Sequence, residues 1–497
     1  MSPQTEDRVV RTYAGWFNER RVFAFNLTPV AFISLAVIVV ITLAIMYTGG
    51  VPAALMIGGA ALLLWLPLII SVGDKSAYEA LLLGRQWGRQ RRKAQHIYRA
   101  GPLSNQAGGR SRLPGIGADT ELWWALDKFG NRFGFVRMPS THQYTVTLRC
   151  RVGGAAGNDQ ELIDSFVGSW ANFLAGLGQV GNIAAMAVTV ETLPETGERA
   201  QANFAAITDP GAPAEALAIM AERIAAADNT GYRVHSRISI TFDATTPAQR
   251  KDPMLAAAVI GNQLPVFYGQ LAHCNVTALP MSDTEISATV RRAYDPASES
   301  DIEAALARGD YVSDWADAGP IAAEETKDTY LHDSGCSRVW VMRTPPSGFP
   351  TERVLLGLLA PNSSVPRKRI TLIFRPYSPG DAAKTVEGDF KSAVGKVNTA
   401  RGIASAQAGL ELEASSAARV AEARGHGLVR MSMIVTATCL DENDLDALEP
   451  EMKALASGAR LNLRPAYRHQ AAAYLSGLAV AGVLLPDHAT IPKSLRA

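Results

Sequence analysis

Cysteine is scarce in this chain of 497 residues, and its few copies lie far apart. No two of them form a CxxC pair, so the sequence has neither the spacing of a structural zinc site nor the framework of a disulfide-rich secreted domain. Widely scattered cysteines are typical of reduced thiols in a cytoplasmic domain. They are Cys150, Cys274, Cys336 and Cys439.

The chain also lacks an excess of charge of either sign. Its formal net charge is +1, with 48 Lys and Arg against 47 Asp and Glu. No overall field therefore draws it to a polyanion, and we do not expect it to bind nucleic acid directly.

Catalytic motifs are missing as well. The nearest approach to a Walker A loop, Gly395-Lys396, has Phe390 in place of the first glycine and Val397 in place of the magnesium-binding Ser or Thr. No GxSxG elbow occurs. Residues 176–181 read GxGxxG, but they end a predicted helix and precede a strand, so we interpret them as a helix-stop loop. We therefore expect no enzymatic activity and no cofactor.

Metal-binding patterns are equally weak. His332 and Cys336 lie four residues apart, but no second pair follows at metal-finger spacing. The acidic run from Asp441 to Glu449 lacks the glycine of a calcium loop, and we interpret it as the first turns of a helix. We expect no metal site.

Two long apolar runs near the N-terminus are the strongest signal in the sequence. Residues 27–47 and 53–72 carry no charged side chain, and each matches the roughly 20 apolar residues that cross a ~30 Å hydrocarbon core. Only a few residues separate them, so they predict an antiparallel transmembrane hairpin with both chain ends on one side. Trp65 is placed to act as an interfacial anchor.

Basic residues flank this hairpin on both sides. By the positive-inside rule they predict a two-pass protein of the plasma membrane with both termini in the cytoplasm. They also predict contact with lipid headgroups. The candidate lipid-contact residues are Arg20, Arg21, Trp65, Arg89, Arg91 and Arg92.

Composition and periodicity divide the chain into six parts. They are an interfacial arm (1–26), the transmembrane hairpin (27–72), a basic juxtamembrane helix and linker (73–117), a first α+β module (118–244), a connecting segment (245–335) that is irregular after residue 297, and a second α+β module (336–497).

The second module has the clearer pattern, βαββαβ, which is ferredoxin-like. We therefore predict an α+β cytoplasmic region, containing this ferredoxin-like module, anchored by a two-helix transmembrane hairpin. The first module is expected to be a sheet covered by helices on one face. The elements of the second module are strand 337–344, helix 351–359, strands 369–377 and 428–439, helix 442–456 and strand 461–465.

An Ala-rich insertion, 380–424, interrupts that module, and its apolar residues recur every three or four positions as in a helical hairpin. The insertion is either a local packing arm or a docking surface for another subunit. The candidate docking residues are Val386, Phe390, Val394, Val397, Leu410 and Val420.

The order of these parts resembles type IV secretion machinery. A closing helix, 469–483, carries Gln470, Tyr474, Leu475 and Leu478 ahead of Leu485-Pro486, and the pattern Arg-Arg-Ala-Tyr-Asp-Pro stands at 291–296. The chain resembles the short membrane subunit of actinobacterial conjugation systems fused to the N-terminal, non-ATPase half of the secretion ATPase.

This resemblance implies a membrane scaffold in an oligomeric apparatus, with a separate P-loop ATPase, other membrane subunits and membrane lipids as partners. A second similar family is the E component of type VII secretion, which also has two N-terminal membrane helices and a cytoplasmic α+β domain. The competing classes are a membrane-tethered enzyme acting on the cell envelope and a membrane-bound sensor.

Overall fold

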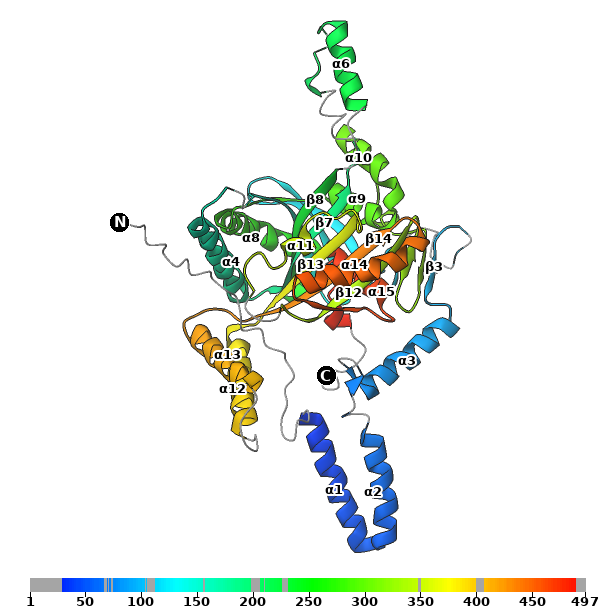
Figure 1. Cartoon of the computed structure of the whole chain (residues 1–497), viewed down its shortest axis with the longest axis vertical. Coiled ribbons are helices and arrows are strands. Elements are labelled where there is room, and N and C mark those ends of the chain that lie inside the picture. Colours follow the sequence, from blue (N-terminus) through cyan, green and yellow to red (C-terminus); the bar gives the residue numbers. More distant parts are fainter. Residues whose placement is uncertain are drawn as a thin grey trace, which may run out of the picture. The chain divides into compact units, whose positions relative to one another are not determined.

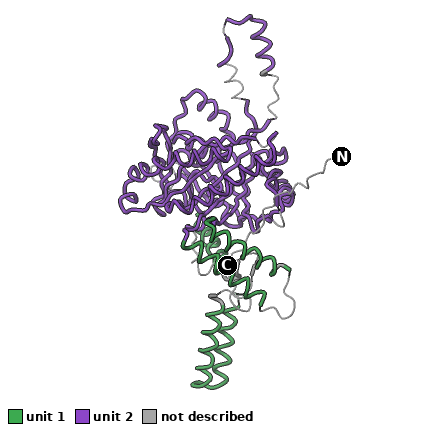
Figure 2. Tube along the Cα trace, turned by 90° about the vertical axis from the view of Figure 1, so that its left-hand side faces the viewer, with its two compact units in different colours: residues 1–95, 380–426, 488–497 green, residues 96–379, 427–487 purple. Residues whose placement is uncertain are grey.

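A computed structural model describes residues 29–66, 69, 71–72, 75–102, 104, 112–154, 157–197, 206–209, 211–225, 231–346, 350–398 and 406–488. The chain forms two compact units, which Figure 2 colours separately. Unit 1 comprises residues 1–95, 380–426 and 488–497, and unit 2 comprises residues 96–379 and 427–487. The predicted arm, 1–26, lies outside the described residues.

Unit 2 is built on one large antiparallel sheet, which has 13 strands in the described part of the chain. Eleven strands follow one another in the order β3-β10-β11-β12-β14-β13-β7-β8-β6-β5-β4, while β15 pairs with β12 and β9 pairs with β6. The strands are β3 (Ile97–Arg99), β4 (Glu121–Leu126), β5 (Arg132–Met138), β6 (Gln143–Val152), β7 (Ile183–Pro194), β8 (Tyr232–Asp243), β9 (Val276–Pro280), β10 (Ala322–Glu325), β11 (Tyr330–His332), β12 (Gly335–Thr344), β13 (Arg367–Pro376), β14 (Val429–Cys439) and β15 (Asn462–Pro465).

The same succession of elements occurs twice within this sheet. Strand, helix, two strands, helix and strand follow one another in β6-α4-β7-β8-α8-β9 and again in β12-α11-β13-β14-α14-β15. The two halves meet where β7 pairs antiparallel with β13, and the hydroxyls of Thr189 and Thr371 lie 3.2 Å apart in that pairing. Each half carries its helical insertion between its second and third strands.

The predicted fold class is therefore wrong. The strands assigned to two separate modules belong to one sheet that runs through most of the chain, in a large mixed α/β protein rather than a small ferredoxin-like module with a transmembrane hairpin. The physical reason is that β7 and β13 would each leave a row of unpaired backbone groups at a sheet edge. Pairing with each other satisfies these groups, and no local sequence pattern reports a pairing across about 180 residues.

Helices cover both faces of the large sheet, not one face as predicted for the first module. Neighbouring strand residues point to opposite faces. Ala187 packs with α9 and α15, whereas Met186 packs with α4 and α8, which lie side by side in Figure 1. The helices of unit 2 are α4 (Gln160–Val180), α6 (Ala214–Ala225), α7 (Pro247–Lys251), α8 (Pro253–His273), α9 (Asp283–Tyr294), α10 (Glu299–Arg308), α11 (Leu356–Leu359), α14 (Leu445–Gly458) and α15 (Gln470–Leu478).

The segment predicted to be irregular, 297–335, is ordered. It forms α10 and the short strands β10 and β11, which extend the sheet beyond β12. Strands of four and three residues are too short to display a two-residue period, so the sequence pattern missed them.

Unit 1 contains two helix pairs. The first consists of α1 (Pro29–Gly49) and α2 (Val51–Trp65), where the indole nitrogen of Trp65 donates to Ser34 Oγ over 3.0 Å. Gly58 of α2 permits this approach, because a Cβ there would lie 2.6 Å from the Thr42 side chain. The second pair consists of α12 (Pro379–Asn398) and α13 (Ala406–Ala423). The unit also holds α3 (Ala77–Arg92) and a two-stranded sheet of β1 (Ser71–Val72) and β2 (Lys75–Ser76).

Among the described residues, one helix is long and apolar enough to cross a membrane. This helix is α1, and none of its residues 32–49 is buried. Helix α2 has 15 residues and spans about 22 Å at 1.5 Å per residue, which is short of a ~30 Å core. The predicted two-pass topology is therefore not supported. A helix like α1 near the N-terminus is also found in signal sequences, so it is weak evidence for a membrane anchor.

Candidate functional site

The predicted lipid-contact residues fall into three groups. Arg20 and Arg21 lie outside the described residues. Trp65 is 7% exposed and packs against Phe32, Leu35 and Ile38 within the α1–α2 pair. The remaining three, Arg89, Arg91 and Arg92, occupy the last turn of α3 and are exposed. Contact with lipid stays a prediction for all of them.

The predicted docking residues also differ in how deeply they are buried. In α12, Val386 is buried, while Phe390, Val394 and Val397 are half-buried. In α13, Leu410 and Val420 are 58% and 48% exposed.

Contacts between charged and aromatic side chains hold α12 against α13. Arg419 places its guanidinium 4.1 Å from the centre of the Phe390 ring and its Nε 3.0 Å from Glu387. The Lys396 ammonium lies 2.8 Å from Glu411. Phe390 thus packs within the insertion, while Leu410 and Val420 are the more exposed candidates, and docking to a partner stays a prediction for all six residues.

The glycine-rich stretch 176–181 is a helix end, as predicted. Helix α4 stops at Val180, and Gly181 adopts the left-handed conformation with φ of 79° before β7 begins. Gly178 lies within the helix, where a Cβ would come 2.6 Å from the Tyr377 carbonyl oxygen. The glycines thus permit chain reversal and close packing, and none of these contacts resembles a phosphate cradle.

Alanine substitution should have opposite effects on stability at two of these glycines. We expect Gly178→Ala to destabilise the protein because backbone must move to admit its Cβ. Gly176→Ala should instead stabilise it by roughly 0.5–1 kcal/mol, because Gly176 is helical and a Cβ there meets nothing within 4 Å. Thermal unfolding of both variants checks this prediction, and a loss of stability in both would contradict it.

His332 and Cys336 do not form a ligand pair. His332 is 1% exposed, and its Nδ1 and Nε2 hydrogen-bond to the Tyr294 carbonyl (2.7 Å) and Ser337 Oγ (2.8 Å). Burial lowers the pKa of His332 to about 4, so the ring is neutral. Cys336 instead lies opposite Cys439 in the register of β12 and β14, and all four cysteines are free thiols.

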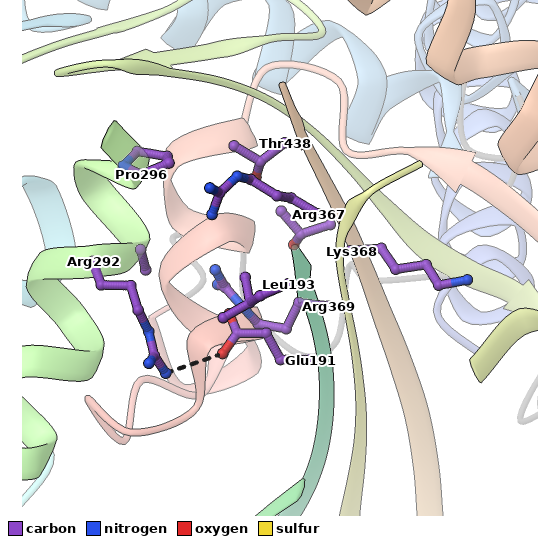
Figure 3. A pocket seen from close by; sticks show the side chains of 10 residues that line it. Glu191, Leu193, Arg292, Pro296, Arg367, Lys368, Arg369 and Thr438 are labelled. Atoms are coloured by element: carbon purple, nitrogen blue, oxygen red, sulfur yellow. Dashed lines mark hydrogen bonds and ion pairs between the residues drawn. The ribbon is translucent and has the colours of Figure 1, made fainter. Parts of the chain in front are cut away.

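A buried group of charged side chains is the most unusual feature of unit 2. We call it the ionic cluster; it lies on the face of the large sheet that α9 and α15 cover, at the junction of β7 and β13. Figure 3 shows part of it. Its members are Glu191 on β7, Arg233 and Arg237 on β8, Arg292 on α9, Glu299 and Glu303 on α10, and Arg367 and Arg369 on β13.

Glu191 occupies the centre of the cluster and is 4% exposed. Arg237 Nη1 lies 2.7 Å from one carboxylate oxygen, and Arg369 Nε lies 2.9 Å from the other. Arg292 Nη2 approaches to 3.8 Å, the contact dashed in Figure 3. One carboxylate thus serves three guanidinium groups.

The electrostatics keep Glu191 ionised. Burial by itself raises the pKa of this carboxyl, but Arg237, Arg369 and Arg292 together outweigh burial and hold the pKa well below its usual range. For the neighbouring His235, burial and Arg292 lower the pKa to about 3, so the imidazole adds no charge.

The rest of the cluster joins the sheet to α10. Arg233 Nη2 lies 3.1 Å from Glu299, which also pairs with Arg367, and Arg233 pairs further with Glu303. Glu195 approaches the Nε of Arg233 to 3.5 Å. These pairs tie β8, β13 and α10 together, so the carboxylates of the cluster hold elements of unit 2 in place.

A small cavity of about 20 Å³ lies against this cluster. The cavity holds only a few water-sized particles, so a bulky organic substrate does not fit within it. Lys368 borders the cavity, but its side chain points away from it in Figure 3 and donates to the Ala360 carbonyl. The other polar residues that line the cavity are Glu191, Arg292, Arg367, Arg369, Thr436 and Thr438.

Beside the cluster, Tyr294, Tyr330, His332 and Tyr474 form a buried aromatic group with centroids 4.8–6.4 Å apart. Gln470 at the start of α15 accepts from the Val339 amide (2.8 Å) and donates to the Val339 carbonyl (3.1 Å). The closing helix is thereby fixed to β12. Its residues have structural roles in unit 2.

Glu325, at the end of β10, is expected to make the stability of the protein depend on pH. Burial raises the pKa of this carboxyl to about 7, against hydrogen bonds from the Ala471 and Gln470 amides. Its contribution to stability is therefore present below the unfolded pKa of about 4.5 and is lost as the pH rises through about 7. Glu325→Gln should raise the melting temperature at pH 8 and change it little at pH 5. An equal change at both pH values would be evidence against this assignment.

Sequence reasoning missed the ionic cluster. The available signal was the spacing of Arg233, His235 and Arg237 at every second residue, which in a strand places three basic side chains on one face. A second signal was Glu191, a charged residue within a segment rich in Ala and Val.

The comparisons with known proteins concern the N-terminal segment. A family model described as "Domain of unknown function (DUF8461)" matches residues 20–79, which is well under half of the chain. No curated protein matches the chain. The match covers α1 and α2 and the start of α3, and its description names no function.

Proposed function

We propose that this protein is a membrane-anchored structural subunit of a bacterial secretion or conjugative-transfer apparatus and that it docks a separate P-loop ATPase. The observation that carries the proposal is the ionic cluster, because its carboxylates and guanidiniums pair with one another beneath covering helices. Groups used in this way hold strands together, and the cavity beside them is small for a substrate.

Two further features support a role in assembly. The uncovered apolar helix α1 supports anchoring in the membrane. The α12–α13 insertion is closed by its own contacts yet leaves Leu410 and Val420 exposed, which favours a surface for another protein. The order of elements along the sequence, which resembles conjugation machinery, supplies the identity proposed for the partner.

Affinity purification of the full chain from its native membranes in mild detergent tests this proposal. Mass spectrometry should find a Walker-motif ATPase with the wild-type chain, and Leu410→Glu combined with Val420→Glu should abolish its recovery. A matched control is Val312→Glu combined with Ile321→Glu, which adds the same two charges at exposed apolar residues of unit 2 and should keep the ATPase.

Recovery of the protein alone, even after chemical cross-linking, would overturn the scaffold proposal. Equal loss of the ATPase in the control would show that α13 is not the docking surface. Unchanged melting temperatures of all variants establish that each chain is folded.

A further inference from the structure

The charges of the ionic cluster do not balance. Five arginines lie against four glutamates when Glu195 at the edge is included, and His235 is neutral. The excess of positive charge is larger around Glu191, because one carboxylate faces three guanidinium groups there. A buried charge without a counter-charge is strongly unfavourable, so this region calls for an additional anion.

Unpartnered donors mark where that anion belongs. Arg369 Nη1, Arg292 Nε and Thr436 Oγ1 are buried polar atoms with no hydrogen-bond partner. All three residues line the cavity, and their exposed fractions are 5%, 9% and 1%. Buried guanidinium N–H groups almost always find an acceptor, and a guanidinium has no acceptor of its own to offer a neighbour.

Size and access restrict the occupant. A cavity of about 20 Å³ holds only a few water-sized particles, which favours a small inorganic ion over a nucleotide. Arg292 and Arg367 retain 9% and 14% side-chain exposure, so the cavity lies close to solvent from which an ion can exchange.

We propose that this cavity binds a single small monovalent inorganic anion, with chloride as the probe that fits its size. Arg369, Arg292 and Thr436 donate to the ion, whose charge balances the excess of arginine. The ion thereby stabilises the junction between the two halves of the large sheet.

Thermal unfolding of the purified full chain in detergent tests this site. Sodium chloride replaces sodium gluconate at constant ionic strength, because gluconate is too large for the cavity. The melting temperature should rise by a few degrees with the logarithm of the chloride concentration, as expected for a ligand that binds only the folded state. An identical melting temperature in both salts would overturn the proposal.

Two variants locate the effect. Thr436→Val removes a cavity donor without changing charge, and Arg292→Gln removes the excess positive charge; both should weaken or abolish the chloride response. The matched control is Thr192→Val, since Thr192 Oγ1 is also buried and unpartnered but does not line the cavity. It should respond to chloride as the wild type does.

Chloride-35 NMR gives a readout that is independent of stability. Wild-type protein should broaden the chloride resonance, and Thr436→Val should reduce the broadening while Thr192→Val does not. A response that persists unchanged in Thr436→Val and Arg292→Gln would show that chloride acts elsewhere, which would contradict this assignment.

Discussion

Replacing Glu191 with glutamine should lower the free energy of unfolding by about 3–5 kcal/mol, the usual cost of breaking a buried ion pair by removing one partner. Glutamine preserves the shape of the side chain but leaves three buried guanidinium groups without their shared carboxylate. Urea unfolding of the wild type and the variant measures the difference.

An exposed pair provides the control for Glu191. Arg308 and Asp310 are 62% and 57% exposed, so Asp310→Asn should change the free energy of unfolding by no more than about 1 kcal/mol. Because the pKa of Glu191 is lowered in the folded state, its contribution is fully present above the unfolded value of about 4.5 and is lost as the pH falls towards the folded pKa. Equal losses in the two variants would contradict the central role of Glu191.

Replacing Tyr474 with alanine should cost a similar amount, about 3–5 kcal/mol, as for other large aromatic side chains in a core. Tyr474 is fully buried in α15, its hydroxyl donates to the Ala293 carbonyl, and Arg369 lies 5.1 Å from the centre of its ring. The substitution therefore creates a cavity next to the ionic cluster and removes a hydrogen-bond donor.

Two substitutions separate these effects in thermal unfolding. Tyr474→Phe keeps the ring and loses only the hydroxyl, so it should cost about 1–3 kcal/mol. Tyr467→Ala, at a 43% exposed tyrosine of the same region, should cost far less. A loss from Tyr467→Ala as large as that from Tyr474→Ala would argue against a core role for α15.

Local elements were predictable because they depend on nearby residues. The strand expected at 428–439 is β14, Val429–Cys439, and the helix expected at 442–456 is α14, Leu445–Gly458. The predicted closing helix, 469–483, was too long. It ends at Leu478 because Ala479 takes a left-handed conformation with φ of 63°, and the chain from Val480 to Leu484 is then buried in the core.

Long-range pairing and the buried charges were not predictable from the same patterns. In the first half of β8 the usual alternation is inverted, since Val234 is 49% exposed while Arg233 and Arg237 are 6% and 3% exposed. Hydrophobicity alone places the valine inside. The inversion is stable only because Glu191, Glu299 and Glu303 meet the arginines, and those partners come from elements far along the chain.

Liposome flotation tests the central claim most directly, because it requires both the anchor and the docking surface. Purified full chain is reconstituted into liposomes and mixed with the Walker-motif ATPase recovered with it. The account predicts that the ATPase floats with liposomes containing the wild-type chain and stays at the bottom with empty liposomes or with the Leu410→Glu, Val420→Glu chain. An ATPase that never floats with the wild-type chain, or a chain that itself fails to float, would contradict the account.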